Sequence, residues 1–373
     1  MGKRLYIIAG EASGDLHGAN LVKALKKLQP DLDVQGWGGD LMQEAGVRIT
    51  KHYRELAFMG FAEVVANLRT ISKNFKRSKA DIAEFAPDAV ILIDYPGFNL
   101  RMAPFIKSLG IPIHYYISPQ VWAWKESRVK QIKTYVDHLY CILPFEHAFF
   151  AKHNFAVEFV GHPLLDVVAA RSEDPEFESK FRAKNNLDDR PIIALVPGSR
   201  AQEINRILPV MCSVIRSFPQ FQFVVAGAPS TAEEVYSTIN PKLKVVCRQT
   251  YDLFHVATAG LVTSGTATLE AALHGMPQVV CYKGGTLSYL IAKRLIKVKY
   301  ISLVNLIMDD EIVTELIQNE LNTSRLNEEL KKLLNPTHRS QVGMDYANLE
   351  TKLGGPGASS RTATLIIKSL NER

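Results

Sequence analysis

Short runs of apolar residues, each followed by a turn and then by a helical pattern, most constrain the fold of this chain. The first run covers residues 5–9, a glycine-containing turn covers residues 10–14, and Leu21, Leu25 and Leu28 then fall on one helical face. The run is continuous rather than alternating, as in parallel strands that are covered on both faces. The pattern predicts a strand, a turn and a helix at the start of a parallel α/β sheet.

The same pattern recurs in two series, one in each half of the chain. The expected strands are residues 5–8, 89–93, 113–117 and 139–143 in the first half, and 192–196, 221–226, 243–246, 260–263 and 278–282 in the second. Helical patterns separate them, which is typical of doubly wound α/β domains. We therefore predict two Rossmann-like domains that face each other across a cleft, with the carboxyl ends of both parallel sheets turned toward a ligand.

A polar segment, residues 171–191, shows no buried face and marks the expected junction between the halves. We predict a first domain over residues 1–166 and a second over residues 167–353; 373 residues suit two domains of roughly 150 to 200 each. The sequence GGPGASS predicts a flexible hinge before a last helix. This third segment, residues 354–373, is expected to have the freedom to cross back to the first domain.

Charge and cysteine content narrow the class of protein. The net charge of +6 favours anionic partners such as nucleotides, phosphorylated substrates, nucleic acid or an acidic membrane surface. The four cysteines (Cys141, Cys212, Cys247 and Cys281) lack metal-site or disulfide spacing, and we interpret them as buried thiols in a reducing compartment. No apolar run reaches the roughly 18 residues of a membrane span, and none resembles a signal peptide. A cytoplasmic protein is expected, with peripheral membrane contact still open.

Two turns in the second half have the composition of anion sites. In LVTSGTATLEAALHGMP a helix is expected to begin near Thr266, where the first amides and the hydroxyls of Ser264 and Thr266 suit a diphosphate. Glu270 lies one helical turn further on, within reach of ribose hydroxyls. The alternative is a capped helix whose Glu270 is merely solvated.

The second of these turns is LVPGSRAQEI, where Arg200 follows the end of an expected strand. An arginine at that position can bind a leaving diphosphate with paired donors. The alternative is a surface ion pair between Arg200 and Glu203.

The first half places candidate catalytic groups after its strands. Asp94, in VILIDYPGFN, follows a buried run and is a candidate general base; its alternative role is to cap the next helix. His162, in the motif GHP, is a candidate for substrate contact or base chemistry, although a lone histidine is more often structural. Trp122 and Trp124 indicate either an aromatic loop over a pocket or core packing.

One segment combines apolar and basic residues. Met59 and Phe61 precede a helical stretch that carries Arg69, Lys73, Lys76 and Arg77. Ordinary amphipathic packing is one explanation. The same combination suits an anionic membrane surface, and a second basic run between Lys283 and Lys299 agrees with it.

Ten motifs occur in a fixed order: GEASGD, AFMGFAEV, IDYPGFN, SPQVWAWK, LPFE, GHP, PGSR, SGTATLE, AKRL and YISLVN. Together they resemble the lipid-A-disaccharide synthase family, from Leu5 to about Gln318. The resemblance implies a GT-B glycosyltransferase fold and peripheral attachment at the cytoplasmic face of the inner membrane.

The resemblance also implies the reaction and the partners. Members of the family transfer 2,3-diacylglucosamine from its UDP derivative to 2,3-diacylglucosamine 1-phosphate, with inversion to a β-1,6 linkage, and UDP leaves. The partners implied are therefore UDP-2,3-diacylglucosamine, 2,3-diacylglucosamine 1-phosphate and the membrane surface, with no nucleic acid; a homodimer stays open. We expect no cofactor and no obligatory metal, because Asp309 and Asp310 fall in a polar loop rather than at a strand end.

Residue roles follow from the resemblance motif by motif. Asp94 matches the family's proposed base, and Glu11 would orient acceptor hydroxyls or assist it. Gly97 stands where some relatives carry a carboxylate, which favours Asp94 as the base. The residues implied in UDP binding are Arg200, Ser264, Gly265, Thr266, Glu270, Asn305 and Gln318.

Two other functions stay open. A non-hydrolysing UDP-sugar epimerase would share the two-domain layout and the nucleotide turn without needing an acceptor. A noncatalytic protein that binds a UDP-sugar or a lipid phosphate is the third candidate. Incubation with a UDP-acylglucosamine separates them, since epimerisation without acceptor supports the first and tight binding without turnover the second.

Overall fold

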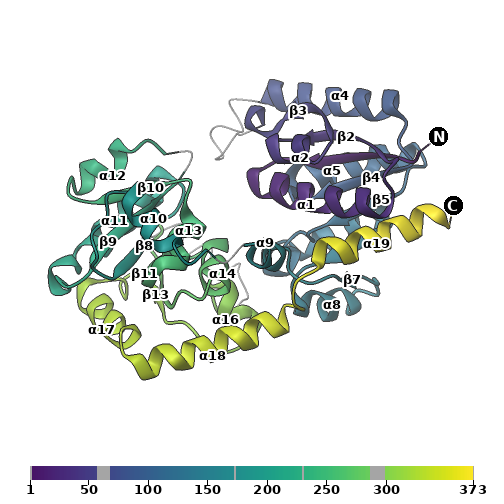
Figure 1. The fold of residues 1–373 in the computed structure, drawn as a ribbon. Coiled ribbons are helices and arrows are strands. Elements are labelled where there is room, and N and C mark those ends of the chain that lie inside the picture. Colours follow the sequence, from purple (N-terminus) through teal and green to yellow (C-terminus); the bar gives the residue numbers. More distant parts are fainter. Residues whose placement is uncertain (1, 57–67, 172–173, 229–230, 286–298, 373) are drawn as a thin grey trace. The chain divides into compact units, whose positions relative to one another are not determined.

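The computed structural model divides into two compact units. Unit 1 comprises Met1–Asp166 and Leu353–Arg373, and unit 2 comprises Val167–Lys352. The structure describes the chain except for residues 1, 57–67, 172–173, 229–230, 286–298 and 373 (Figure 1).

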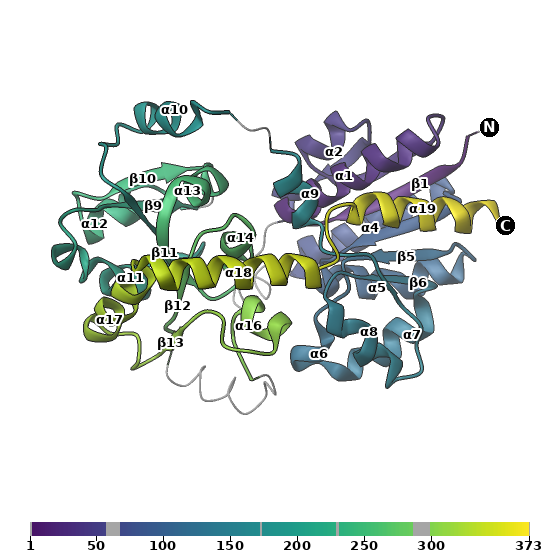
Figure 2. The ribbon, with the colours of Figure 1, turned by 60° about the horizontal axis from the view of Figure 1, so that its bottom comes forward.

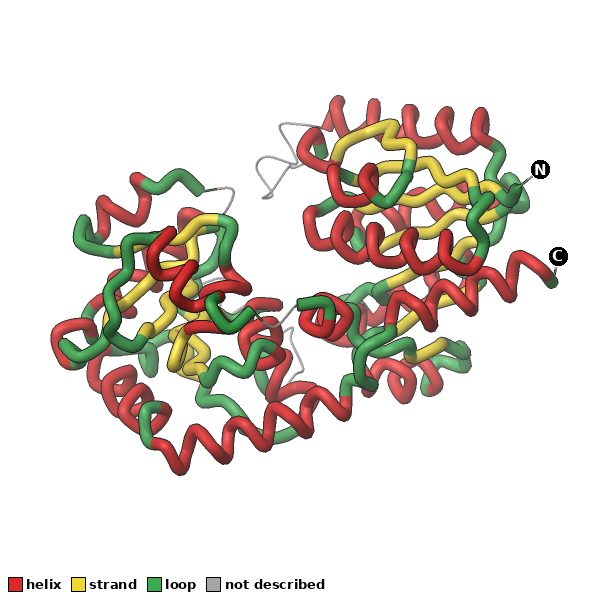
Figure 3. The backbone as a smooth tube through the Cα atoms, in the orientation of Figure 1, coloured by secondary structure: helices red, strands yellow, loops and turns green. Residues whose placement is uncertain are grey.

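Unit 1 is built on a parallel sheet, which in the described residues has the strand order β3-β2-β1-β4-β5-β6-β7 (Figure 3). The order turns back at β1 and β4, which is the doubly wound pattern. The strands are β1 (Arg4–Ala9), β2 (Asp33–Gly38), β3 (Arg48–His52), β4 (Ala89–Ile93), β5 (Ile113–Tyr116), β6 (His138–Cys141) and β7 (Glu158–Phe159).

Helices cover both faces of this sheet, and each face has its own apolar core. One core includes residues of α1, α2 and α19, and the other includes residues of α4, α5, α7 and α8. The helices are α1 (Ala12–Leu28), α2 (Asp40–Glu44), α4 (Leu68–Phe85), α5 (Pro96–Ser108), α6 (Val121–Trp124), α7 (Val129–Tyr135), α8 (Pro144–Ala151) and α19 (Ala358–Asn371), with 3-10 turns η1 (Tyr53–Glu55) and η2 (Glu126–Arg128). The helix α9 (Leu164–Ala169) leads out of the unit.

The last helix, α19, belongs to unit 1 and packs against α1 (Figures 1 and 2). Its apolar face, which includes Ala363 and Ile366, is buried in the same core as α1. The Asp166 carboxylate accepts hydrogen bonds from the backbone N–H groups of Ala358 (3.2 Å) and Ser359 (2.9 Å). A carboxylate at a helix amino terminus is favoured by the helix dipole, so Asp166 anchors α19 where it joins the sheet.

Unit 2 repeats the architecture with the order β10-β9-β8-β11-β12-β13 in its described residues. The strands are β8 (Ile192–Val196), β9 (Gln222–Gly227), β10 (Lys244–Cys247), β11 (Ala257–Thr263), β12 (Gln278–Tyr282) and β13 (Glu315–Ile317). The helices are α10 (Phe177–Lys184), α11 (Ala201–Cys212), α12 (Glu234–Ile239), α13 (Thr250–Val256), α14 (Thr266–Leu273), α16 (Leu303–Met308), α17 (Thr323–Leu333) and α18 (Pro336–Lys352), with the 3-10 turn η3 (Ile215–Ser217). Two Rossmann-like units with parallel sheets confirm the predicted fold class.

Two predictions about packing are wrong. The polar segment after the first unit is not without a buried face, since Phe181 of α10 lies in the core of unit 2. Cys247 is exposed at the end of the edge strand β10, so the four thiols are not all buried.

Candidate active site

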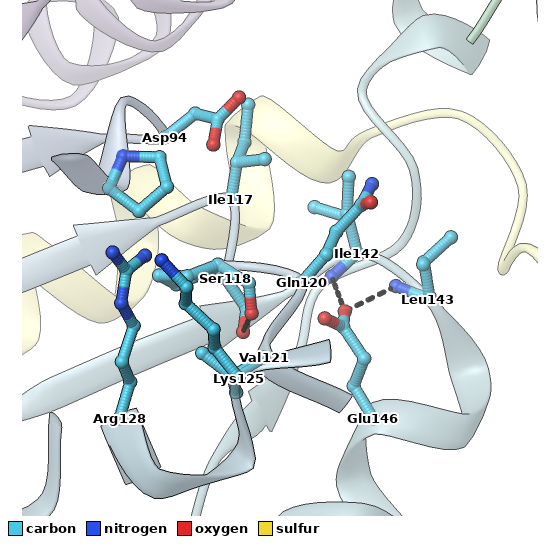
Figure 4. A pocket seen from close by; sticks show the side chains of 12 residues that line it. Asp94, Ile117, Ser118, Gln120, Val121, Lys125, Arg128, Ile142, Leu143 and Glu146 are labelled. Carbon is cyan, nitrogen blue, oxygen red and sulfur yellow. Dashed lines mark hydrogen bonds between the residues drawn. The ribbon is translucent and has the colours of Figure 1, made fainter. Parts of the chain in front are cut away.

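A pocket of about 260 Å³ lies at the carboxyl ends of β4, β5 and β6 in unit 1 (Figure 4). Asp94 follows β4, and the loop after β5 leads into the short α6. The lining residues are Asp94, Pro96, Ile117, Ser118, Pro119, Gln120, Val121, Lys125, Arg128, Ile142, Leu143 and Glu146. The predicted base therefore faces a cavity together with residues of the SPQVWAWK and LPFE motifs.

The backbone at this edge adopts an uncommon conformation. Asp94 has φ 41°, Tyr95 has φ 47° and Ile117 has φ 67°. Residues with side chains rarely adopt positive φ, and each such residue costs on the order of 1–3 kcal/mol. Neighbouring contacts hold the turn, because the Tyr115 hydroxyl (2.6 Å) and the Asn99 amide (2.8 Å) both donate to the Asp94 carbonyl oxygen. The alternative role of Asp94 is not seen, since α5 begins at Pro96 with Tyr95 as its N-cap and no side-chain cap bond.

Burial sets the protonation of Asp94. Removal from water, with the negative charge of Glu11 adding to it, raises the pKa of the Asp94 carboxyl to about 6. Glu11 is exposed at the amino end of α1. The turn between them needs a glycine at position 10, because a Cβ there would lie 2.3 Å from the Tyr95 ring. The elbow after β1 thus brings one carboxylate beside another rather than forming a bare amide cradle.

Glu146 also lines the pocket, although it was not predicted as a site residue and stood only within the motif LPFE. Its carboxylate is fully buried and accepts hydrogen bonds from the N–H groups of Leu143 (3.0 Å) and Ile142 (3.2 Å) and from the Trp122 indole (3.3 Å). Burial raises the pKa of Glu146 to about 7. The motif LPFE could have predicted this role, because it places proline at the first position of α8 and glutamate at the third, which is the pattern of a capping box.

His162 is buried and does not line the pocket. Its ring Nδ1 atom accepts a hydrogen bond from the Leu164 backbone N–H (3.3 Å), and the backbone N–H of His162 donates to the Leu353 carbonyl (3.2 Å). Burial, together with nearby His17, lowers the pKa of His162 to about 3, so the ring is neutral near pH 7. These contacts fix the start of α9 and hold Leu353, where the chain re-enters unit 1.

Unit 2 has a pocket of about 460 Å³ at the carboxyl ends of β8, β9 and β11. It is lined by Val196, Gly198, Ser199, Arg200, Glu203, Ala226, Ala228, Thr250, Thr263, Ser264, Gly265, Thr266, Ala267 and Glu270. Five predicted UDP-binding residues therefore line one cavity, and α14 begins at Thr266 as expected.

The polar groups of this pocket are mostly exposed. Arg200 is 68% exposed and lies 3.6 Å from the Glu203 carboxylate, so the alternative ion pair exists beside the pocket. Gly265 and Thr266 are exposed, whereas the Ser264 hydroxyl donates to the Ile301 carbonyl (2.9 Å). An anion that enters would meet Arg200 and the amino terminus of α14.

Glu270 differs from these exposed groups. Burial raises the pKa of its carboxyl to about 7, and the Tyr251 hydroxyl is its hydrogen-bond partner. The alternative prediction, that the Glu270 carboxylate is merely solvated, is therefore wrong.

Asn305 and Gln318 lie outside the lining of that pocket. The Asn305 amide group donates to the Val313 carbonyl (2.8 Å) and to Glu315 (2.9 Å), and its oxygen accepts from the N–H groups of Ile312 and Val313. Asn305 thus ties α16 to β13. Gln318 follows β13 with φ 56°, and its buried Nε2 has no hydrogen-bond partner.

The basic segment of unit 1 is described only in part. Met59 and Phe61 lie outside the described residues. Arg69, Lys73, Lys76 and Arg77 are exposed on α4, and Arg77 donates to the Thr50 carbonyl. Phe75 stacks on Phe98 at 4.4 Å on the inner side of the helix.

Over residues 5–368 the chain matches the family described as lipid-A-disaccharide synthetase. The chain belongs to this family. A relative named lipid-A-disaccharide synthase, from Syntrophus aciditrophicus, is 42% identical over 381 residues, which cover 98% of this chain and 99% of the relative. The chain is accordingly a glycosyltransferase of lipid A biosynthesis, and the family favours this function over the two alternatives.

Solved structures of proteins with low sequence identity to this family member share its fold. UDP-GlcNAc 2-epimerase from Neisseria meningitidis, bound to UDP-GlcNAc, has a TM-score of 0.68 at 13% identity and covers 99% of this chain and 100% of its own. The calicheamicin glycosyltransferase CalG4 has a TM-score of 0.59 at 14% identity, covering 100% and 99%. Epimerase and glycosyltransferase thus share the GT-B architecture, and the fold alone does not choose between them.

In the described part of this family member, no helix is both long and apolar enough to cross a bilayer.

Proposed function

We propose that this chain transfers 2,3-diacylglucosamine from UDP-2,3-diacylglucosamine to the 6-hydroxyl of 2,3-diacylglucosamine 1-phosphate. The products are a β-1,6-linked disaccharide 1-phosphate and UDP. The observation that carries the proposal is Asp94, a shielded carboxylate fixed at the edge of a sugar-sized pocket with a pKa of about 6. A general base works best with a pKa near the working pH, and this one is mostly ionised at pH 7.

The chemistry is a single in-line displacement. The 6-oxygen of the acceptor attacks the anomeric carbon of the donor while its proton passes to Asp94. The bond from that carbon to the diphosphate breaks, and UDP leaves with the electron pair, so the anomeric centre inverts. Glu11, whose charge raises the pKa of Asp94, would orient acceptor hydroxyls; His162 takes no step in this scheme.

Unit 2 would bind the nucleotide part of the donor. Arg200 and the amino terminus of α14, with Gly265 and Thr266, suit the diphosphate, because fixed donors there neutralise charge that builds up on the leaving group. The Ser264 hydroxyl could also bind the diphosphate if it gave up its hydrogen bond to the Ile301 carbonyl. Glu270 suits the ribose hydroxyls, and Gln318 offers an unpaired amide.

Mass spectrometry of the products from the two named substrates tests the reaction. A disaccharide 1-phosphate formed only when both substrates are present is the expected result. Epimerised UDP-sugar without acceptor would support the epimerase, and tight binding without turnover would support a binding protein. The Arg216→Gln variant, changed at an exposed residue outside the two pockets, serves as a matched control and should retain full activity.

We further propose peripheral attachment to an anionic inner membrane through α4 and the preceding segment with Met59 and Phe61. Both substrates carry acyl chains, so the enzyme has to meet them at an interface. Arg69, Lys73 and Lys76 are exposed on the outer side of α4, whose inner side packs on α5. Each cation near an anionic leaflet is worth on the order of 1 kcal/mol.

Cosedimentation with phosphatidylglycerol vesicles tests the attachment. Reversal of Lys73, Lys76 and Arg77 to Glu should release most of the protein, whereas reversal of the exposed Lys184, Lys242 and Lys244 of unit 2 changes the net charge equally and should release little. Replacing Met59 and Phe61 with Ser should reduce the salt-resistant fraction. Equal release by both charge reversals would contradict a surface confined to α4.

A further inference from the structure

We propose that Lys125 and Arg128 bind the phosphate of the acceptor sugar, in the same pocket that holds Asp94. This inference rests on the proposed function, in which the acceptor carries a phosphate at one end and the reacting hydroxyl at the other. It assigns two residues to the recognition of that phosphate.

The position of the two cations carries the inference. Lys125 and Arg128 are the basic residues among the lining of the pocket, and Figure 4 shows their head groups side by side below the turn after β4, while the Asp94 carboxylate points away from them. The pocket, at about 260 Å³, is slightly below the size of pockets that bury drug-sized ligands. It suits a sugar phosphate head group, with the acyl chains left outside.

The segment that carries these cations is fixed from several sides. Lys125 and Arg128 lie three residues apart around η2, and the Arg128 N–H donates to the Lys125 carbonyl (2.9 Å). The adjoining α6 is held because the Trp122 indole donates to buried Glu146 and its ring packs edge-on against Phe145 at 4.8 Å.

Charge distribution gives the pocket a direction. The Asp94 carboxylate lines one side of the pocket, and its negative charge, with that of nearby Glu11, would repel a phosphate. Glu146, the other carboxyl in the lining, is occupied by two backbone N–H groups and the Trp122 indole. Lys125 and Arg128 form the positive end, and an arginine fork with a lysine point charge suits a phosphate dianion. A sugar phosphate would therefore enter with its phosphate on the cations and its free hydroxyl toward Asp94.

Kinetics with two acceptors test the assignment. The acceptors are 2,3-diacylglucosamine 1-phosphate and the same monosaccharide without phosphate. The variants are Lys125→Gln and Arg128→Gln, with Lys130→Gln as the matched control, because Lys130 is exposed on α7 outside the pocket lining. Each variant should lose about 10- to 100-fold in kcat/KM with the phosphorylated acceptor, the scale of a charge-assisted contact. Little should change with the unphosphorylated acceptor, and the KM of the UDP donor should stay the same.

The outcomes separate this inference from the proposed function. Partial recovery by Arg128→Lys and an unchanged melting temperature would support direct phosphate binding. Equal losses with both acceptors, or an unchanged preference for the phosphorylated one, would overturn the assignment while leaving the transferase reaction intact. If the wild-type chain forms no disaccharide from either acceptor, the proposed function fails and this inference falls with it.

Discussion

The described sheets of the two units share a doubly wound strand order, to which unit 1 adds the edge strand β7, but they place very different groups at the carboxyl ends of their strands. In unit 1 the Asp94 carboxyl is largely removed from water, and the backbone at this edge has positive φ at Asp94, Tyr95 and Ile117. In unit 2 the corresponding edge presents Arg200, which is 68% exposed, and the open turn at Gly265. The same fold thus supports one edge that is built rigidly and one that is open.

The difference teaches how the two tasks divide. A base must keep its pKa and its position before substrate arrives, so the contacts from Tyr115 and Asn99 that hold the Asp94 backbone are made within the protein. A diphosphate brings its own charge, so Arg200 can remain paired with Glu203 until the ligand replaces that partner. We therefore expect substitutions in unit 1 to affect catalysis and stability, and those in unit 2 to affect binding.

The largest expected effect is on turnover, in unit 1. Asp94→Asn should lower kcat by roughly 100-fold or more, the scale of a lost general base, with unchanged affinity for UDP. In the wild-type chain, kcat should fall below pH 6 as Asp94 takes up a proton. Glu11→Gln is the matched control, because removing that charge should move the acid limb to lower pH. Near-normal turnover in Asp94→Asn would transfer the role of base to another group.

The next effect is on the stability of unit 1. Glu146→Ala leaves the N–H groups of Leu143 and Ile142 and the Trp122 indole without their acceptor, which should lower the free energy of unfolding by about 2 to 3 kcal/mol. Urea titration measures it. The control is Glu126→Ala, which removes only an exposed partner of His153 and should cost less than about 1 kcal/mol. Similar losses in both variants would contradict a structural role for the buried carboxylate.

Sequence reasoning found the residues that directly follow apolar runs. Asp94 and Thr266 were placed correctly because a continuous run, a turn and a helical pattern fix where a parallel strand ends. The strands β2 and β3 were missed, since β2 contains Gly36 and polar residues and β3 is a mostly polar strand at the sheet edge; the short strands β7 and β13 were missed as well. Gly36 is required there because a Cβ would lie 1.9 Å from the Ile7 carbonyl oxygen, a contact that local sequence does not reveal.

The features that could not be predicted from the sequence depend on contacts between distant parts of the chain. The positive φ of Asp94 and Ile117 depends on what packs around them, and no residue type announces it. The amide of Asn305 was expected to contact nucleotide, but its donors and acceptor are taken up by the segment before and within β13. Packing of α19 on α1 joins the two ends of the chain, and periodicity shows only that α19 has an apolar face.

A smaller effect is expected on UDP binding in unit 2. Arg200→Ala should weaken UDP binding by about 10- to 50-fold, because a charge-assisted contact to the diphosphate is lost, while the melting temperature stays the same. Arg200→Lys should recover part of the affinity, since lysine keeps the charge without the fork. Titration calorimetry with UDP measures both variants. Unchanged affinity together with normal kinetics would show that the exposed arginine pairs only with Glu203.

The smallest effect is a pH dependence of stability that both units share. Burial raises the pKa of Glu146 in unit 1 and of Glu270 in unit 2 from 4.5 to about 7. The folded state therefore binds more protons than the unfolded state between these values. The stabilisation that each group gives is fully present below about pH 4.5 and is lost as the pH rises through 7.

Buried histidines with lowered pKa values, His17 and His162 in unit 1, act in the opposite direction in this range, since the stability that they give is present above about pH 6.5 and is lost on acidification. The net decline from pH 5 to pH 8 should consequently be small, about 1 kcal/mol. Calorimetric melting at both pH values measures it, and Glu146→Gln and Glu270→Gln should each flatten the decline, because an amide does not titrate. A melting temperature that rises from pH 5 to pH 8 and is insensitive to both substitutions would mean that the buried histidines dominate and that the pKa values of Glu146 and Glu270 are not raised.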